Sequence, residues 1–213
     1  MFKLFDKKNI ILRKFGIEDY LNTVNKMNFF TKNRKKNTLD EVWLLEHNSV
    51  FTVGRSTKKI SIPKNSKISI IETDRGGSIT YHGSGQQILY VLLDLKRNSL
   101  KIRNLIYLLE DTVISTLKDL NINSQTNQRS PGIYVDGKKI CSFGLKIHNG
   151  CSMHGLALNV SMDMSPFNEI VPCGNFDINM TQIREFIPDI RMSIVEKILV
   201  KNFCRIFNFQ KIN

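Results

Sequence analysis

Apolar residues along the chain follow two spacings, and each spacing predicts a different kind of element. Segments 18–30 and 103–120 place apolar side chains every three or four residues, which is typical of an amphipathic helix. The same pattern predicts a closing helix over 194–207. Shorter apolar runs predict strands, and we expect those at 68–72 and 87–95 to be buried. The predicted strands are 9–12, 41–46, 68–72, 87–95, 132–135, 139–147 and 153–160.

Turn residues and the order of elements indicate the fold class. Asp136 and Gly137 lie between two predicted strands, and an Asp-Gly pair suits the positive φ angles of a tight hairpin turn. A polar linker is expected over 121–130. Strands and helices segregate instead of alternating, so we expect an α+β fold with a mainly antiparallel or mixed sheet flanked by helices. The length of 213 residues suits a single domain over 1–213.

Composition excludes several classes of protein. No stretch is long and apolar enough to span a bilayer, and residues 1–12 lack the apolar run of a secretory signal. The four cysteines, at positions 141, 151, 173 and 204, form no CxxC pair. We therefore expect reduced thiols in a cytoplasmic protein. His82 and His154 could line a pocket, but their spacing does not match a zinc site, so we expect no metal.

The net charge of +12 raises the question of a nucleic-acid partner, because clustered Lys and Arg release counterions from phosphates. The densest basic run is short, KNRKK at 32–36, and the other cations are scattered. We therefore expect a solvated basic surface and no nucleic acid. Two alternatives stay open at this point. One is a basic binding module for nucleic acid, and the other is a patch that attracts an acidic protein partner.

The segment 74–87, DRGGSITYHGSGQQ, is the most unusual in the chain. It places four glycines together with Arg75, Tyr81 and His82 between two apolar strands. Glycine lets a backbone approach a ligand closely, so this loop is a candidate binding loop. It is neither a P-loop nor a GxGxxG dinucleotide motif. The alternative is a plain hairpin loop.

Cys173 is the candidate nucleophile. It lies in an irregular segment, between Pro172 and Gly174, whereas the other three cysteines lie in or beside apolar elements and suit ordinary core packing. A thiol reacts as the thiolate, which a nearby cation stabilises. The residues alone do not decide which cation does so. The candidates are Lys138, Lys139, Lys146 and the four histidines.

Strand alternation gives one further expectation for these lysines. In a strand over 139–147, Lys139, Cys141 and Phe143 would share one face, and Lys138 and Ile140 the other. A lysine that points inward among apolar neighbours would be desolvated and would suit the role of a base. The alternative for any one lysine is a position at the surface.

Taken together, the motifs resemble one family. They are the loop at 74–87, GIYVDGKKICSFGLKI at 132–147, SMHGLALNV at 152–160 and PCG at 172–174. They are similar to the lipoyl(octanoyl) transferases of bacterial lipoate biosynthesis, which are related in fold to the biotin and lipoate protein ligases. The resemblance covers about 41–182. Ser84 stands where the family usually has Pro, and Val53 where Gln is common.

The resemblance implies roles for individual residues. Cys173 would carry the octanoyl thioester, and Lys139 would lower its pKa and shuttle protons. Phe143, Leu156 and Ala157 would line an apolar acyl channel. The substrate-binding residues implied are Arg75, Gly76, Gly77, Ser78, Ile79, Thr80, Tyr81, His82, Ser142, Phe143, Gly144, Gly155, Leu156 and Ala157.

The resemblance also implies partners. The donor would be octanoyl-acyl carrier protein, and the acceptors would be lipoyl domains of 2-oxoacid dehydrogenases and the glycine cleavage H protein. The enzyme would act as a monomer. It would need no cofactor, because the conversion of a thioester to an amide is favourable in free energy. The alternative is an ATP-dependent lipoate-protein ligase on the same fold, which activates a free acid as an adenylate and needs no cysteine nucleophile.

Overall fold

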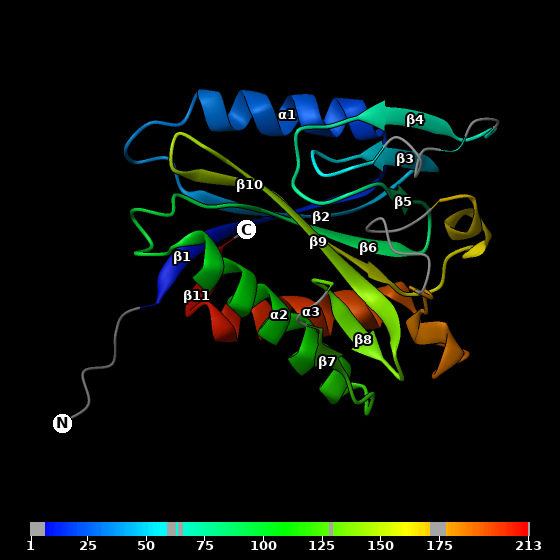
Figure 1. The fold of residues 1–213 in the computed structure, drawn as a ribbon. Coiled ribbons are helices and arrows are strands. Elements are labelled where there is room, and N and C mark those ends of the chain that lie inside the picture. The colour runs from blue at the N-terminus through cyan, green and yellow to red at the C-terminus, as the bar shows by residue number, and fades with distance from the viewer. Residues whose placement is uncertain (1–6, 59–62, 64–65, 128–129, 171–177, 213) are drawn as a thin grey trace.

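The computed structural model describes residues 7–58, 63, 66–127, 130–170 and 178–212 (Figure 1). Its three α-helices are α1 (Tyr20–Lys32), α2 (Ile102–Asp119) and α3 (Met192–Ile206). Two short 3-10 helices are η2 (Ser165–Glu169) and η4 (Ile183–Glu185). The strands are β1 (Lys8–Glu18), β2 (Asp40–His47), β3 (Val50–Val53), β4 (Ser69–Glu72), β5 (Thr80–His82), β6 (Gln86–Leu92), β7 (Gln125–Thr126), β8 (Ile133–Val135), β9 (Lys138–His148), β10 (Cys151–Asn159) and β11 (Phe209–Ile212).

One large sheet organises the molecule. Its eight strands follow the order β11-β1-β2-β6-β10-β9-β8-β7. Strand β1 runs parallel to both β11 and β2, and every later neighbour pair is antiparallel. The sheet is therefore mixed, and the expected α+β class is confirmed. A smaller sheet, β4-β3-β5, lies beside it.

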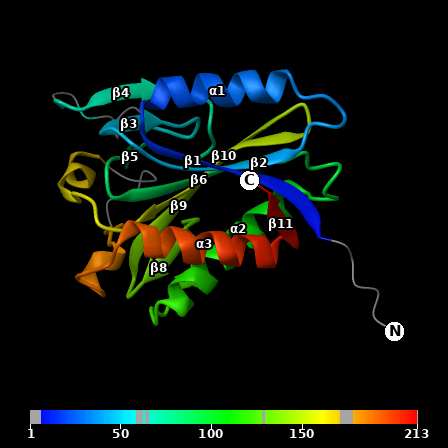
Figure 2. The same cartoon turned by 180° about the vertical axis from the view of Figure 1, so that it is seen from behind.

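Helices cover both faces of the large sheet. Figures 1 and 2 show α1 on one face and α2 with α3 on the other. Alternate residues of β2 serve the two sides: Val42 packs in the core beneath α2 and α3, while Trp43 packs with Met27 of α1. Because both faces are buried, the central strands β2 and β6 read as nearly continuous apolar runs.

The predicted helices all form, with boundaries shifted by two residues or fewer. Asp19 caps α1 by accepting a hydrogen bond from the Asn22 amide, 2.8 Å. The sequence did not predict the short strands β3, β5, β7 and β11. Strand β7 lies in the expected linker, β5 lies in the candidate loop, and the apolar run at 87–95 ends as a strand at Leu92.

One prediction of burial was wrong. Strand β4, predicted as buried, lies at the edge of the small sheet, and among the described residues it pairs with β3 alone. Ile70 in this strand is 40% exposed. An edge strand has a partner on one side only, so its apolar content was a poor guide to its burial. Among the described residues, no helix is long and apolar enough to cross a membrane.

Candidate active site

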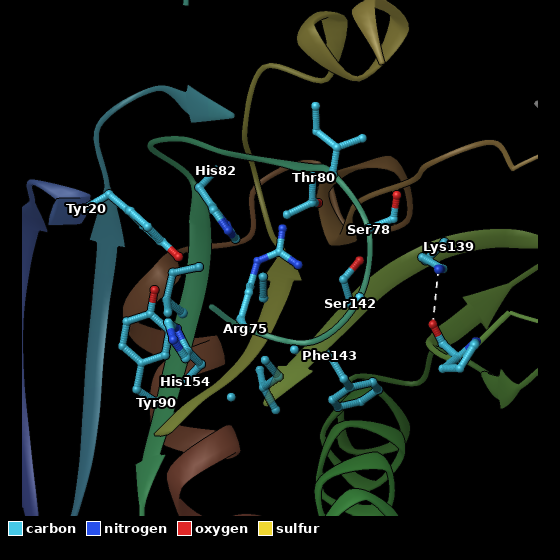
Figure 3. Close-up of a pocket in the computed structure, with 18 residues that line it drawn as sticks. Tyr20, Arg75, Ser78, Thr80, His82, Tyr90, Lys139, Ser142, Phe143 and His154 are labelled. Atoms are coloured by element: carbon cyan, nitrogen blue, oxygen red, sulfur yellow. Dashed lines mark hydrogen bonds between the residues drawn. The ribbon is translucent and has the colours of Figure 1, made fainter. Parts of the chain in front are cut away.

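A single elongated cavity gathers most of the predicted site residues (Figure 3). It lies between the loop that follows β4 and the paired strands β9 and β10, and its space of about 640 Å³ is partly open to solvent. Its lining residues are Tyr20, Arg75, Gly77, Ser78, Ile79, Thr80, His82, Ile88, Tyr90, Pro131, Lys139, Ser142, Phe143, Gly144, His154, Gly155, Leu156 and Ala157.

All of the implied substrate-binding residues except Gly76 and Tyr81 line this cavity. The backbone of Gly76 is bound to β9 instead, since its amide donates to the Leu145 carbonyl at 2.9 Å. Tyr81 points into a separate apolar cluster, where its ring meets Phe51 and Phe167. The alternation of side chains along β5 accounts for this split, because Thr80 and His82 flank Tyr81 and face the cavity.

Lys139 lies at one end of the cavity with its charge well supported. Its side chain is 1% exposed. The Nζ atom donates to the Ser130 hydroxyl at 3.2 Å and to the Pro131 carbonyl at 3.1 Å, and lies 5.4 Å from the centre of the Tyr134 ring. Two acceptors and an aromatic face all favour a cation at this position. Lys138, its neighbour in sequence, is exposed and faces Glu185.

The expected alternation along β9 does not hold at Lys139. The register against β8 shifts, because Ile133 pairs with Cys141 while Tyr134 pairs with Lys139. This bulge leaves Ile140 unpaired and puts both Ile140 and Cys141 into the main core. Lys139, Cys141 and Phe143 were expected to share one face of the strand. Lys139 and Phe143 both line the cavity, but Cys141 does not.

The predicted nucleophile, Cys173, lies outside the described residues, as do Pro172 and Gly174. The other three cysteines are free thiols, and Cys141 and Cys151 are buried as expected. Burial raises the pKa of Cys141, which disfavours its thiolate. Cys204 is half-buried, and burial raises the pKa of this thiol too. None of these three is suited to nucleophilic attack.

The glycine loop is fastened to both of its neighbours. The Arg75 side chain is buried and donates to the hydroxyl and carbonyl oxygens of Thr52 on β3. Asp74 accepts from Lys146 on β9 and from His154 Nε2 on β10, the latter at 3.1 Å. Hydrogen bonds from His154 and then Lys146 hold the pKa of Asp74 well below its usual range. The loop is thus held over the cavity from two sides.

Two glycines in β9 and β10 allow the loop and the strands to approach closely. A Cβ atom on Gly155 would lie 2.0 Å from the Leu89 carbonyl oxygen. One on Gly144 would lie 3.0 Å from Cδ of Arg75. Gly155 and Gly144 face each other across the β9–β10 pair. A side chain at Gly155 cannot be accommodated without moving β6.

The end of the cavity remote from Lys139 is aromatic (Figure 3). Tyr90 donates to His47 Nε2 at 2.7 Å, and His47 Nδ1 donates to the Glu18 carbonyl at 2.9 Å. The Glu18 carbonyl places a proton on His47 Nδ1, and burial favours the neutral ring by lowering the pKa of His47 to about 4. Tyr20 stacks on His82 with ring centres 5.9 Å apart.

His154 is built into this end at some cost. It has a φ of 60°, in the left-handed region that most residues avoid. The side chain is 1% exposed, and its buried Nδ1 has no hydrogen-bond partner among the described residues. Burial lowers the pKa of His154, although Asp74 acts in the opposite direction. His82 and His154 both line the cavity, as expected for histidines of a pocket.

Comparisons with known proteins identify the family. The sequence matches the lipoyl protein ligase A/B catalytic domain over residues 19–204. The chain belongs to this family. An octanoyltransferase of Buchnera aphidicola subsp. Acyrthosiphon pisum (strain APS) is 47% identical over 97% of this chain and 98% of its own. Another, from Photorhabdus laumondii subsp. laumondii, is 43% identical over 95% of each chain.

Solved structures of ligases share the fold. The crystal structure of lipoate-protein ligase A bound with ATP superposes with a TM-score of 0.74 at 14% identity, covering 97% of this chain and 90% of that one. The biotin protein ligase from Aquifex aeolicus in complex with biotin and ATP has a TM-score of 0.56 at 14% identity, covering 94% and 70%. These likenesses confirm the fold that the resemblance implied.

The sequence did not point to several residues of the site. Tyr20 and Tyr90 occupy apolar positions of a helix and a strand, so their pattern indicated core packing. Asp74 belongs to the candidate loop, but its two partners lie 72 and 80 residues away along the chain. The only signal for this cluster in the sequence was that an acidic residue lies beside the glycine loop while basic residues lie in the later strands.

Proposed function

We propose that this protein transfers an octanoyl group from acyl carrier protein to a lysine of a lipoyl domain, through a thioester on Cys173. The observation that carries the proposal is a buried lysine, Lys139, at one end of an elongated cavity whose walls include Phe143, Leu156 and Ala157. An apolar channel suits an acyl chain, and a lysine at its end suits acyl transfer. The octanoyltransferase relatives support the same activity.

The first half of the reaction acylates the enzyme. The Cys173 thiolate, stabilised by Lys139, attacks the thioester carbonyl of the donor. A tetrahedral intermediate forms and collapses, which breaks the bond to the phosphopantetheine sulfur. Lys139 supplies the proton that the departing thiolate takes up. The octanoyl chain is then held as a thioester on Cys173, with its tail in the apolar cavity.

The second half transfers the chain to the acceptor. Lys139 accepts a proton from the lipoyl-domain ammonium, and the resulting amine attacks the Cys173 thioester. The nitrogen of the tetrahedral intermediate loses its second proton to solvent, and collapse of the intermediate then forms the amide and releases the Cys173 thiolate. The change from thioester to amide is downhill, so the cycle needs no ATP. One lysine thus handles the proton in both halves.

The proposed activity implies particular partners and a cellular location. The donor is an acyl carrier protein, and the acceptors are the lipoyl domains of 2-oxoacid dehydrogenases and the glycine cleavage H protein. We place the reaction in the cytoplasm, which agrees with the free thiols of Cys141, Cys151 and Cys204. The chain would act as one catalytic domain and as a monomer.

The test compares two ways of supplying the acyl group to a purified lipoyl domain. With octanoyl-acyl carrier protein and no ATP, we expect the domain to gain one octanoyl group by mass. With free octanoate and ATP, we expect no gain. Modification only in the second reaction would instead support an ATP-dependent lipoate-protein ligase.

A further inference from the structure

We propose that Tyr20 and Tyr90 form an end wall that limits the length of the acyl chain. This inference rests on the proposed function. Both tyrosines line the cavity, and Figure 3 shows them on the side opposite Lys139. They come from different elements, α1 and β6, so the wall has two independent halves.

Strand register gives the separation, measured along the strands, between the level of Tyr90 and the level of Lys139. Tyr90 pairs with Gly155, which pairs with Gly144 of β9. Gly144 is five residues from Lys139 along β9, about 17 Å at the usual rise of a strand. The seven carbon–carbon bonds of an octanoyl chain span no more than about 11 Å. Along the strands, an octanoyl chain that begins near Lys139 therefore ends before the level of Tyr90.

The wall is held rigidly by hydrogen bonds behind it. Tyr90 donates to His47 Nε2 at 2.7 Å, and Tyr20 donates to Thr73 Oγ1 at 2.9 Å. The two side chains are 4% and 2% exposed. Moving Tyr90 aside to admit a longer chain would leave the buried His47 Nε2 without its donor, which is unfavourable. The wall therefore resists displacement.

The hydroxyl protons of both tyrosines are already used in these bonds. The wall consequently selects by shape and not by bonding to the chain. Shortening either ring should open space for two more carbons, while removing only a hydroxyl should not. Selection between chains that differ by methylene groups in an apolar pocket is about 10- to 200-fold in enzymes.

The experiment measures transfer of hexanoyl, octanoyl, decanoyl and dodecanoyl groups from acyl carrier protein to a lipoyl domain. We expect wild-type protein to prefer octanoyl over decanoyl by at least about tenfold. Tyr20→Leu and Tyr90→Leu should each raise the decanoyl-to-octanoyl ratio by about tenfold or more. Tyr20→Phe and Tyr90→Phe keep the ring but lose its hydrogen bond, so each should leave the ratio closer to the wild-type value than the matching Leu variant does. Tyr107→Leu, at a 68% exposed position of α2, is the matched control.

Two results would contradict the proposal that Tyr20 and Tyr90 limit the length of the acyl chain. One is wild-type protein that transfers dodecanoyl as fast as octanoyl, which decides the matter even if a Leu variant does not fold. The other is a folded Leu variant at each position with an unchanged ratio. Wild-type protein that transfers no chain of any length would contradict the proposed function itself, and the inference with it.

Discussion

The two ends of the cavity treat buried polar groups in opposite ways. At one end, two oxygen acceptors and the Tyr134 ring surround the Lys139 ammonium and favour its charge. At the other end, burial lowers the pKa of His47, His82 and His154 and keeps the imidazoles neutral. A site that moves protons needs a supported cation, whereas a site that receives an acyl tail is better without charge. Under the proposed function, this difference assigns proton transfer to one end of the cavity and selection of the acyl chain to the other.

Replacement of Lys139 should have the largest effect, because it removes the cation from the charged end. For Lys139→Met we expect kcat/KM to fall by about 10²- to 10⁴-fold. The pH profile of Cys173 alkylation should also move to higher pH. Lys138→Met changes the adjacent residue, whose side chain is 51% exposed, and should leave both readouts unchanged. An unaltered alkylation profile in Lys139→Met would end the assignment of Lys139 to the thiolate.

The close packing of β10 against β6, between the two ends of the cavity, is tested by Gly155→Ala. The new Cβ atom would lie 2.0 Å from the Leu89 carbonyl oxygen, so β6 and β10 must separate. We expect the free energy of unfolding to fall by about 3 kcal/mol. Gly16→Ala is the control, since no atom lies within 4 Å of its new Cβ. Equal denaturation midpoints for the two variants would show that β10 and β6 are not closely packed at Gly155.

The neutral end predicts a pH dependence of stability. The folded pKa of His47 is about 4, below its ordinary value of 6.5. As the pH falls from 6.5 to 4, the unfolded chain binds a proton that the folded chain does not, so stability is lost across this window. The full contribution is present above pH 6.5 and approaches about 3 kcal/mol.

Urea unfolding at a series of pH values measures this slope. His47→Asn should reduce the slope between pH 6.5 and 4, and the part that remains comes from other groups such as His82 and His154, whose pKa values burial also lowers. His148→Asn, a histidine outside the aromatic end, should retain it. If His47→Asn retains the wild-type slope, the neutral histidine is not what makes this end sensitive to acid.

Loss of the contacts that Asp74 makes with Lys146 and His154 should have the smallest effect. Asp74→Asn weakens the contacts with Lys146 and His154, and Asp74 is itself partly exposed. We expect a loss of about 1 kcal/mol in stability and a severalfold rise in KM, with kcat little changed. Asp119→Asn, which breaks an exposed pair with Lys201, is the matched control. A fall in kcat with an unchanged KM would show that these contacts serve chemistry instead of binding.

Local patterns in the sequence predicted the helices, most of the strands and only part of the site. Helical spacing predicted α1, α2 and α3 because each buries one continuous stripe. The glycine loop was recognisable from residue types alone, and the choice of Cys173 as nucleophile, made on the same ground, stays a prediction. Lys139 was not, since spacing left several cations open and only the resemblance to a family selected it. The bulge at Ile140, which separates Cys141 from Lys139, depends on pairing with β8.

Contacts between distant segments could not be predicted. His47 and Tyr90 lie 43 residues apart, and Asp74 and His154 lie 80 apart, so no local pattern records either pair. Tyr20 and Tyr90 occupy positions that are equally typical of core packing. Their place at the end of the cavity follows from the order of strands in the sheet, which the sequence pattern did not determine.

The most direct test of the account is the intact mass of the protein after mixing with octanoyl-acyl carrier protein, for wild type and Cys173→Ala in parallel. We expect wild-type protein to gain one octanoyl group, to lose it when a lipoyl domain is added, and the variant to gain none. An octanoyl adduct of equal yield on Cys173→Ala, or transfer to the lipoyl domain by that variant at the wild-type rate, would contradict the central claim.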